Sequence, residues 1–313
     1  MSEKIFDWTP QSIGRALDCL RRGGLVAVPT ETVYGLAANA ADGEAVARLY
    51  AAKGRPSFNP LIAHIANLDM AEQQGVFSEN TRALAEAFWP GPLTIVVDVA
   101  ETCTVSDLAR AGLDSIALRV PAHPETLNLI SEFGAPLVAP SANPSGQISP
   151  TMAAHVAADM ADKVDMILDG GTCAAGIEST IIDARGEVPG LLRPGSLEAD
   201  RIDTVWPGLV RPELDPDAPQ SPGQLLRHYA PHAKLRLNAS LVDPGEAFLG
   251  FGNTANATLN LSPGGHLEEA AANLFSMLRR LDAEFERIAV APIPATGLGE
   301  AINDRLTRAA KSA

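Results

Sequence analysis

Short polar clusters recur along the first two thirds of this chain, each on a turn rich in proline or glycine. Arginine forks, lysine point charges, hydroxyls and backbone amides are the groups that bind phosphate and other oxygen-rich anions. The clusters are PTETVYG (29–35), KGRPSFNP (53–60), LRVP (118–121), APSANPSG (139–146), GIESTIID (176–183) and LRPG (192–195). They supply the cations Lys53, Arg55, Arg119 and Arg193 and the donors Thr30, Thr32, Ser141, Asn143, Ser145, Ser179 and Thr180.

The stretch KGRPSFNP raises the possibility of a phosphate site most directly. Its glycine and prolines oppose a helix, so we expect Lys53 and Arg55 on an exposed loop that faces a polyphosphate. Taken singly, KGRP also fits a helix end with a solvated turn, PTET an N-cap and SAN an ordinary turn. His64, inside the apolar run LIAHIA, fits a buried core histidine. The joint occurrence of all the clusters favours one pocket.

Other kinds of site find little support. No Walker A motif and no GxGxxG follows the first expected strand, no GxSxG is present, and the three cysteines lack a catalytic context. The acidic residues lack metal-ligand spacing, although Glu31, Glu178 and Asp183 are candidates to hold Mg²⁺ through water. A site with cations and hydroxyls but no nucleophile indicates catalysis by positioning and charge stabilisation, as in nucleotidyl transfer.

The elements that must position these clusters alternate between helix and strand. Since ligands of open α/β sheets bind at the carboxyl ends of strands, we expect the clusters to meet there. Strand-to-strand stretches also occur, which favours a mixed sheet. Helices are expected at 10–22, 45–53, 78–88 and 151–161, and strands at 25–30, 61–66, 93–99, 115–121 and 136–143 and within DMILDGG, ESTIID and GLLRPG.

A change of composition divides the chain. Residues 205–232 are dense in Pro, Gly and Asp and are expected to be a linker. Residues 1–204 before it form the predicted larger domain. Residues 233–313 after it again alternate strands and helices and form a predicted smaller α/β domain.

The composition limits the function classes. Among 313 residues, 24 are basic and 38 acidic, and the net charge of −14 argues against a broad nucleic-acid-binding surface. Three scattered cysteines without a CxxC pair indicate neither a disulfide framework nor a zinc site, and they fit a reduced, cytoplasmic setting. No signal-peptide core and no run of 18 apolar residues occurs, so we expect no membrane association.

Taken together and in order, the clusters resemble the YrdC family over about residues 10–200. SPGQLLRHYAP (221–231) and NLSPGG…NLFSMLRRLD…GLGEAINDRL resemble its long, two-domain members, the threonylcarbamoyl-AMP synthases. This resemblance implies a twisted mixed sheet with a deep, positively charged cavity, a Rossmann-like second domain and a linker that lies over the cavity as a lid. It also implies that ATP, L-threonine and bicarbonate give threonylcarbamoyl-AMP and pyrophosphate, for tRNA modification beside the anticodon.

The resemblance further implies roles for individual residues. Threonine would be bound by Thr32, His64, Arg119, Ser179 and the backbone of Ala139. ATP would be bound by Lys53, Arg55, Asn59, Ser115, Ser141, Asn143, Ser149, Arg193 and Tyr229, with Lys53 and Arg55 catalytic. Mg²⁺ would accompany ATP, and a separate transferase would take the product to tRNA, so direct tRNA binding is not required. The linker departs from many relatives in carrying Gln224 after SPG, where they have Met.

Two other functions stay open at this point. One is a non-enzymatic RNA-binding module, which the negative charge and the lack of basic, aromatic-interleaved stretches disfavour. The other is a carbamoyltransferase with a different acceptor. The absence of an acylphosphatase-like or zinc-finger segment disfavours that function.

Overall fold

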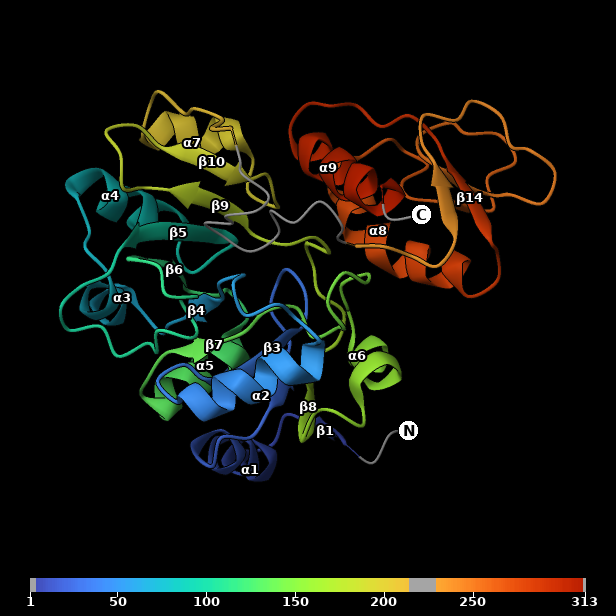
Figure 1. Ribbon diagram of the computed structural model, residues 1–313. Coiled ribbons are helices and arrows are strands. Elements are labelled where there is room, and N and C mark those ends of the chain that lie inside the picture. Colours follow the sequence, from blue (N-terminus) through green and yellow to red (C-terminus); the bar gives the residue numbers. More distant parts are fainter. Residues whose placement is uncertain (1–3, 214–228, 312–313) are drawn as a thin grey trace.

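The computed structural model describes residues 4–213 and 229–311. Residues 4–213, the N-terminal unit, carry a ten-stranded mixed sheet, and residues 233–311, the C-terminal unit, carry a four-stranded parallel sheet (Figure 1). The predicted α/β class with a mixed sheet and a second, smaller α/β part is therefore confirmed. We propose to keep the predicted boundaries at 204 and 232, because each sheet lies wholly on one side of them.

The large sheet has the strand order β1-β8-β2-β3-β7-β4-β6-β5-β9-β10. Its strands are β1 (Ile5–Asp7), β2 (Val26–Val28), β3 (Gly35–Asn39), β4 (Ile62–His64), β5 (Leu93–Asp98), β6 (Ser115–Arg119), β7 (Leu137–Val138), β8 (Met166–Asp169), β9 (Thr180–Asp183) and β10 (Gly190–Arg193). The helices of this unit are α1 (Pro10–Arg21), α2 (Gly43–Lys53), α3 (Leu68–Gln74), α4 (Glu79–Phe88), α5 (Pro124–Phe133), α6 (Ala153–Met160) and α7 (Ala199–Val205).

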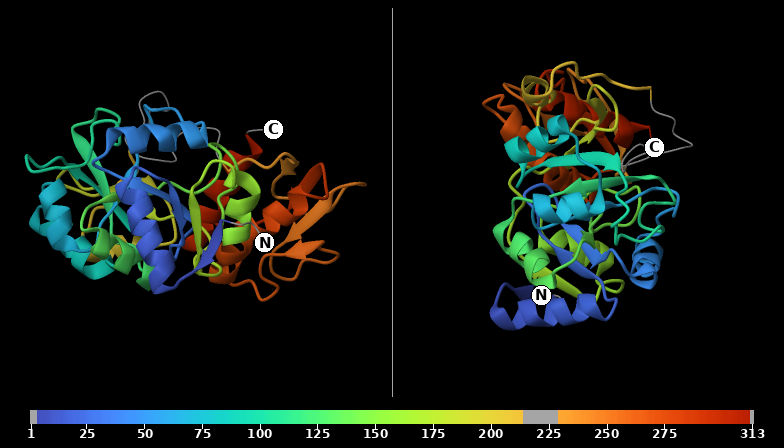
Figure 2. Two further views of the ribbon diagram at one scale, coloured as in Figure 1. Left: turned by 90° about the horizontal axis from the view of Figure 1, so that it is seen from below. Right: turned by 90° about the vertical axis from the view of Figure 1, so that its left-hand side faces the viewer.

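The C-terminal unit has the strand order β11-β14-β12-β13. Its strands are β11 (Lys234–Arg236), β12 (Ala247–Gly250), β13 (Leu259–Asn260) and β14 (Arg287–Val290), and its helices are α8 (Leu267–Asp282) and α9 (Leu298–Ala310). Figure 2 shows this unit beside the N-terminal unit, not over the centre of the large sheet. Within the described residues, no helix combines the length and the apolar character needed to cross a membrane.

Local sequence signals fix the ends of the helices nearest the predicted clusters. Thr9 caps α1 by a capping box with Ser12. The Asp42 side chain accepts the first free backbone N–H groups of α2, and Gly54 ends that helix in the left-handed conformation at φ 61°. Lys53 is thus the last helical residue of α2, and the chain turns away directly behind it.

Strand register brings the clusters to one edge of the large sheet. Parallel strands β4 and β6 place His64 opposite Arg119 at their carboxyl ends. Strand β5 runs antiparallel to β6 and pairs with β9 from Leu93 opposite Thr180, so the amino ends of β5 and β9 lie at this same edge. The mixed sheet therefore gathers both carboxyl and amino strand ends around the site, not carboxyl ends alone as predicted.

The structure corrects parts of the predicted element map. The strand expected at 136–143 is limited to Leu137–Val138, because Pro140 has no N–H to donate and the chain then enters the polar loop. Five elements of the N-terminal unit were not predicted, namely β1, β3, α3, α5 and α7. Their segments are short or carry weak patterns, such as the small residues GLAAN of β3.

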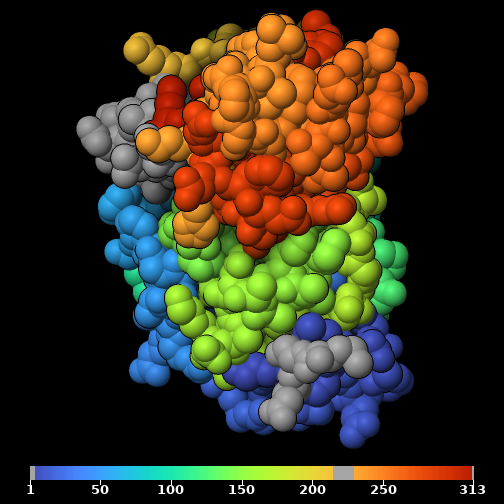
Figure 3. Space-filling view, turned by 90° about the vertical axis from the view of Figure 1, so that its right-hand side faces the viewer, coloured from blue at the N-terminus to red at the C-terminus, as the bar shows by residue number. Residues whose placement is uncertain are grey.

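The C-terminal unit packs directly on loops of the large sheet. Val33, Ile148 and Ile177 of the N-terminal unit share one hydrophobic cluster with Leu274 and Phe275 of α8. The space-filling view shows this unit (orange and red) resting on the lime-green segment that includes α6 (Figure 3). The loops that carry the PTET, SAN and EST clusters therefore contribute to the interface between the two units.

Gly176 lies where the chain approaches α8 closely. It has φ +70°, and a Cβ there would be 2.5 Å from the backbone O of Ala271. Gly171 has a similar φ of +80°, but a Cβ added to Gly171 would have no atom within 4 Å. The two glycines therefore differ in steric contact and not in backbone conformation.

Gly176→Ala is expected to destabilise the protein by about 1–3 kcal/mol more than Gly171→Ala, because both strain the backbone but only the first overpacks the interface. Denaturant unfolding of the two variants measures the difference. Equal losses of stability would show that α8 does not pack against residue 176 in solution.

Candidate active site

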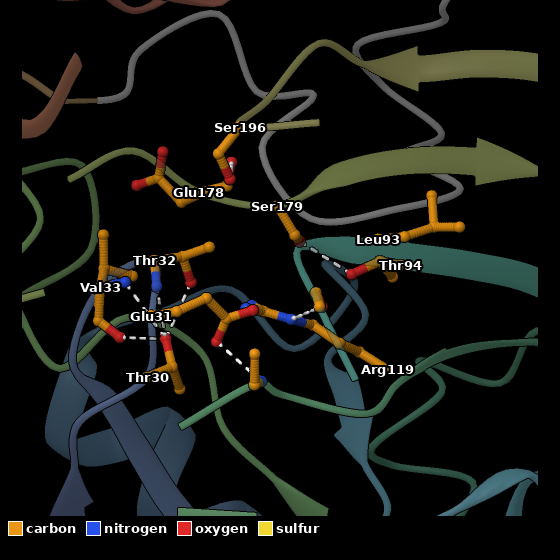
Figure 4. A network of polar contacts seen from close by, with 12 residues as sticks. Thr30, Glu31, Thr32, Val33, Leu93, Thr94, Arg119, Glu178, Ser179 and Ser196 are labelled. Carbon is orange, nitrogen blue, oxygen red and sulfur yellow. Dashed lines mark hydrogen bonds and ion pairs between the residues drawn. The ribbon is translucent and has the colours of Figure 1, made fainter. Parts of the chain in front are cut away.

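A cavity lies at the sheet edge where the clusters meet. Figure 4 shows parts of three of these clusters, namely Thr30–Val33, Arg119 and Glu178–Ser179. Of the residues predicted to bind ligands, its walls include Thr32, Arg55, His64, Arg119, Ala139, Ser141, Ser179, Arg193 and Tyr229. The walls do not include Lys53, Asn59, Ser115, Asn143 or Ser149. The convergence of the separate clusters on one cavity follows the prediction, and the binding role of each residue remains a prediction.

Lys53 and Arg55 are not on an exposed loop, and that expectation is wrong. Their exposed fractions are 3% and 7%. The Lys53 Nζ donates to the carbonyl oxygens of Ser141 and Asn143, both at 2.5 Å, so it holds the SAN loop in place. Burial, with the nearby Arg55 charge, holds the pKa of the Lys53 amine well below its usual value.

Arg55 reaches the cavity wall with its guanidinium partly bound by backbone. Its Nη2 donates to Pro60 O at 2.9 Å and its Nε to Asn59 O at 3.3 Å. Burial first, and then the charge of Arg193, lower the pKa of Arg55 to about 10, so the side chain stays a cation at neutral pH. An anion in the cavity would offset both the burial of the Arg55 charge and its repulsion by Arg193.

Arg119 is held in position by Glu31. Its Nη2 donates to Glu31 Oε1 at 2.7 Å and its Nε to Gly91 O at 3.2 Å (Figure 4). The other oxygen of Glu31 accepts the backbone N–H of Ala122 at 3.1 Å. The Nε and Nη2 groups of Arg119 are therefore already hydrogen-bonded within the protein. Among the described residues, none accepts a hydrogen bond from Nη1.

His64 is neutral in this environment. Burial, together with the charge of Arg119, lowers its pKa to about 3. Its Nδ1 lies 3.3 Å from the backbone O of Ile62, an oxygen that can only accept, so we assign the proton to Nδ1. The Nε2 lone pair is then available to accept a hydrogen bond from a ligand.

The hydroxyls of the PTET loop form a directed chain. Thr30 Oγ1 donates to Val33 O at 2.6 Å, so in its 2.8 Å contact with Thr32 the proton must come from Thr32. The Thr32 oxygen keeps its lone pairs for a ligand donor such as an ammonium or hydroxyl group. The EST loop is fixed similarly, because Ser179 Oγ contacts Thr94 Oγ1 at 2.8 Å (Figure 4).

Arg193 supports the wall beside Ser179. Its Nη2 donates to Ser179 O at 2.8 Å and to Ser179 Oγ at 3.1 Å. Burial first, with the charges of Arg305 and Arg119 among the other causes, lowers the pKa of Arg193. Arg55, Arg119 and Arg193 thus give the cavity three buried guanidinium groups.

The residues predicted to bind the nucleotide that are not in the cavity wall lie elsewhere in the N-terminal unit. Asn143 Nδ2 donates to the carbonyls of Pro144 and Gln147 and shapes the SAN loop, and Ser149 donates to Glu178 Oε1 at 2.5 Å. The Asn59 side chain is buried, and no described residue pairs with either of its polar atoms. Ser115 begins β6, at the opposite end from Arg119.

The three acidic residues considered for magnesium are engaged by arginines. Glu31 pairs with Arg119, and Asp183, at the end of β9 away from the cavity, pairs with Arg185 at 2.6 Å. Glu178 pairs with Arg305 at 2.8 Å. Within residues 4–213 and 229–311, no group of three or more His, Cys, Asp or Glu side chains is placed to hold a metal ion. These three carboxylates therefore support arginines, and the expectation that they assist a magnesium ion finds no support in their contacts.

Sequence reasoning did not predict the supporting contacts of Thr94, Glu31, Glu178 and Arg305. Thr94 and Glu31 contact the cavity residues Ser179 and Arg119, while Glu178 is itself part of the wall and pairs with Arg305 of the C-terminal unit. Glu31 and Glu178 lie inside the polar clusters, which is the available signal for them. Thr94 follows the apolar pattern of a strand, and Arg305 lies 127 residues from its partner, so neither carries a local signal.

We predict that His64 stays neutral between pH 5 and 8. Its folded pKa of about 3 lies below the unfolded value near 6.5, so the folded state binds fewer protons between these two values. Stability should therefore rise with pH across this window, and His64→Asn should flatten that rise. NMR titration of the imidazole measures the pKa directly. A midpoint above pH 6 would contradict the burial of a neutral ring.

Two family models together match most of the chain. Residues 18–195 match the Sua5/YciO/YrdC model, described as "Telomere recombination", and residues 197–311 match "Threonylcarbamoyl-AMP synthase, C-terminal domain".

Full-length relatives agree with the family models. The threonylcarbamoyl-AMP synthase of Pyrococcus abyssi (strain GE5 / Orsay) is 40% identical over an alignment of 331 positions, which covers 98% of this chain and 95% of that protein. The Bacillus subtilis (strain 168) enzyme of the same name is 39% identical, with 95% and 92% covered. A crystal structure of P. abyssi Sua5 complexed with L-threonine matches with a TM-score of 0.90 at 38% identity, covering 98% of both chains. The chain therefore belongs to the Sua5/YrdC family and carries that family's C-terminal Sua5 domain.

Proposed function

We propose that this protein is a threonylcarbamoyl-AMP synthase. It joins L-threonine, bicarbonate and ATP, releases pyrophosphate, and supplies the intermediate for threonylcarbamoyladenosine in tRNA. The observation that carries the proposal is the cavity with three buried arginines beside a neutral histidine, in a chain 40% identical to an enzyme of that name over nearly its whole length. A separate transferase in the cytoplasm would receive the product.

The geometry suggests a threonine side and a nucleotide side. Neutral His64 and the Thr32 oxygen accept hydrogen bonds from the amino acid, and Arg119 attracts its carboxylate. Arg55 and Arg193 supply charge for the phosphates. Lys53 acts indirectly, because its amine holds the loop that carries Ser141.

The reaction balances in two steps. The threonine amine attacks the carbon of bicarbonate, and a carbamate forms as water leaves. A carbamate oxygen then attacks the α-phosphorus of ATP, the new P–O bond forms, and the bond to pyrophosphate breaks. Positive charge at Arg55 and Arg193 offsets the negative charge that builds on the leaving group.

Magnesium enters as part of the substrate, MgATP. The carboxylates near the cavity are bound to arginines, so the residues suit an ion carried by the phosphates and not one held by the protein alone. No step of the reaction is assigned to a protein-bound metal.

Product analysis tests the function. Purified protein with MgATP, L-threonine and bicarbonate should release pyrophosphate and form threonylcarbamoyl-AMP, detected by mass spectrometry. Omission of threonine or of bicarbonate should abolish both products. Pyrophosphate release without threonine would favour a carbamoyltransferase with another acceptor. RNA binding without any ATP turnover would favour an RNA-binding module.

Arg119→Lys is expected to raise the KM for threonine about tenfold, and to raise it more than the KM for ATP. Lysine keeps the positive charge but has only one nitrogen. Its ammonium group cannot bind Glu31 and Gly91 O and also donate a hydrogen bond into the cavity, as the guanidinium of Arg119 can. Steady-state kinetics with each substrate varied gives the two constants.

Arg82→Lys is the matched control, since Arg82 forms an exposed pair with Glu72 on the surface. A change confined to the KM for ATP would move Arg119 to the nucleotide side of the cavity.

A further inference from the structure

Arg305 links the last helix of the C-terminal unit to the cavity. It lies on α9, is fully buried, and its Nε donates to Glu178 Oε2 at 2.8 Å. Glu178 itself lines the cavity. A charged side chain of one unit therefore fixes a charged wall residue of the other.

The second oxygen of Glu178 also depends on the C-terminal unit. Oε1 accepts the hydroxyl proton of Ser149 at 2.5 Å. Arg279 of α8 donates to the carbonyl oxygens of Ile148 and Ser149 and is itself held by both oxygens of Asp159, at 3.2 and 2.6 Å. One arginine thus contacts the carboxylate, and the other holds the backbone of the residue that donates to it.

Besides Glu178, Arg305 contacts Asp304, to which its Nη1 donates at 2.7 Å, and the ring of Tyr229. The Arg305 Cζ lies 5.1 Å from the ring centroid, and Phe275 stacks with the same ring at 5.6 Å. Tyr229 has φ 64°, a conformation that an L-residue adopts only where its surroundings hold it. Since Tyr229 lines the cavity, its position also depends on contacts from the C-terminal unit.

The charges explain why Glu178 needs a partner. Burial alone would raise the pKa of the Glu178 carboxyl, but Arg305 and then Arg193 lower it below its usual value. Glu178 therefore stays ionised beside a cavity suited to anions. Without Arg305, that negative charge would repel a phosphate and would be free to take the N–H groups of Arg193.

We propose that Arg305 is a positioning residue of the reaction, through which the C-terminal unit sets Glu178 and Tyr229 on the nucleotide side of the cavity. The inference rests on the proposed function and deepens it, because Arg305 acts through these two wall residues and is not itself part of the cavity wall.

A role in stability alone explains the arrangement less well. Helix α9 already buries Ile302, Leu306 and Ala309 in the hydrophobic cluster of its unit. A buried ion pair often adds no more stability than apolar side chains of the same size. The fully buried Arg305 is therefore better explained by what it positions.

The test measures MgATP binding by calorimetry and steady-state kinetics on the full chain. Arg305→Met should weaken MgATP binding about tenfold or more and lower kcat, with a smaller change in the KM for threonine. The double variant Arg305→Met, Glu178→Gln should recover thermal stability, since residue 178 then carries no charge and Asp304 keeps its pair with Arg308, yet it should still bind MgATP weakly. Arg305→Lys, which keeps the charge near Glu178, should fall between Arg305→Met and wild type.

Arg308→Met is the matched control on the same helix. Arg308 pairs with Asp304, which keeps its second ion pair with Arg305 in this variant, so binding and kcat should stay within about twofold of wild type. Wild-type MgATP binding in the double variant would overturn the inference and leave a structural role. An equal loss in Arg308→Met would overturn it as well. If Arg305→Met does not fold, the lysine and double variants decide by the same readouts.

The measurement of MgATP binding distinguishes a failure of this inference from a failure of the proposed function. A wild-type protein that binds MgATP but forms no threonylcarbamoyl-AMP would refute the proposed function, while the variants would still decide the role of Arg305 in binding. A wild-type protein that binds no MgATP would overturn both.

Discussion

The burial of several arginines around one cavity is the constraint on which this structure depends. Guanidinium groups cannot lose their charge near neutral pH, so each must find acceptors inside the protein. Arg55 uses the carbonyls of Asn59 and Pro60, and Arg193 uses that of Ser179. Arg119 requires Glu31. The turns rich in proline and glycine are therefore the parts that satisfy buried cations, and the charge they leave uncompensated is available to an anionic substrate.

Much of this could be predicted from the sequence, because the signals are local. Alternation of helix and strand indicated the mixed α/β class, and the recurring turns indicated the converging clusters. Lys53 shows where local signals fail. Its neighbours Gly54 and Pro56 mark a helix end correctly, yet exposure depends on the SAN loop, which packs over it from nearly ninety residues away. Burial at a turn is set by distant segments, and a single sequence does not report them.

Contacts between distant segments also explain why the sequence indicated magnesium for Glu31 and Glu178, which the structure pairs with arginines. Glu31 and Glu178 were recognised as polar residues near the site, but their arginine partners lie 88 and 127 residues away along the chain. In the sequence alone, a carboxylate whose arginine partner is distant along the chain cannot be distinguished from a metal ligand. The dependence of the site on the C-terminal unit was equally hidden, since Arg305 belongs to a helix whose pattern indicates only packing. The linker residues 214–228 lie outside the described residues, so the predicted lid stays a prediction.

The central claim is that this one cavity holds both threonine and the nucleotide. A crystal structure with L-threonine and an ATP analogue that resists cleavage between the α- and β-phosphates tests it most directly. The account predicts the threonine carboxylate within hydrogen-bonding distance of Arg119, and the phosphates within reach of Arg55 and Arg193. Phosphates bound outside this cavity, or threonine bound away from Arg119 and His64, would contradict it.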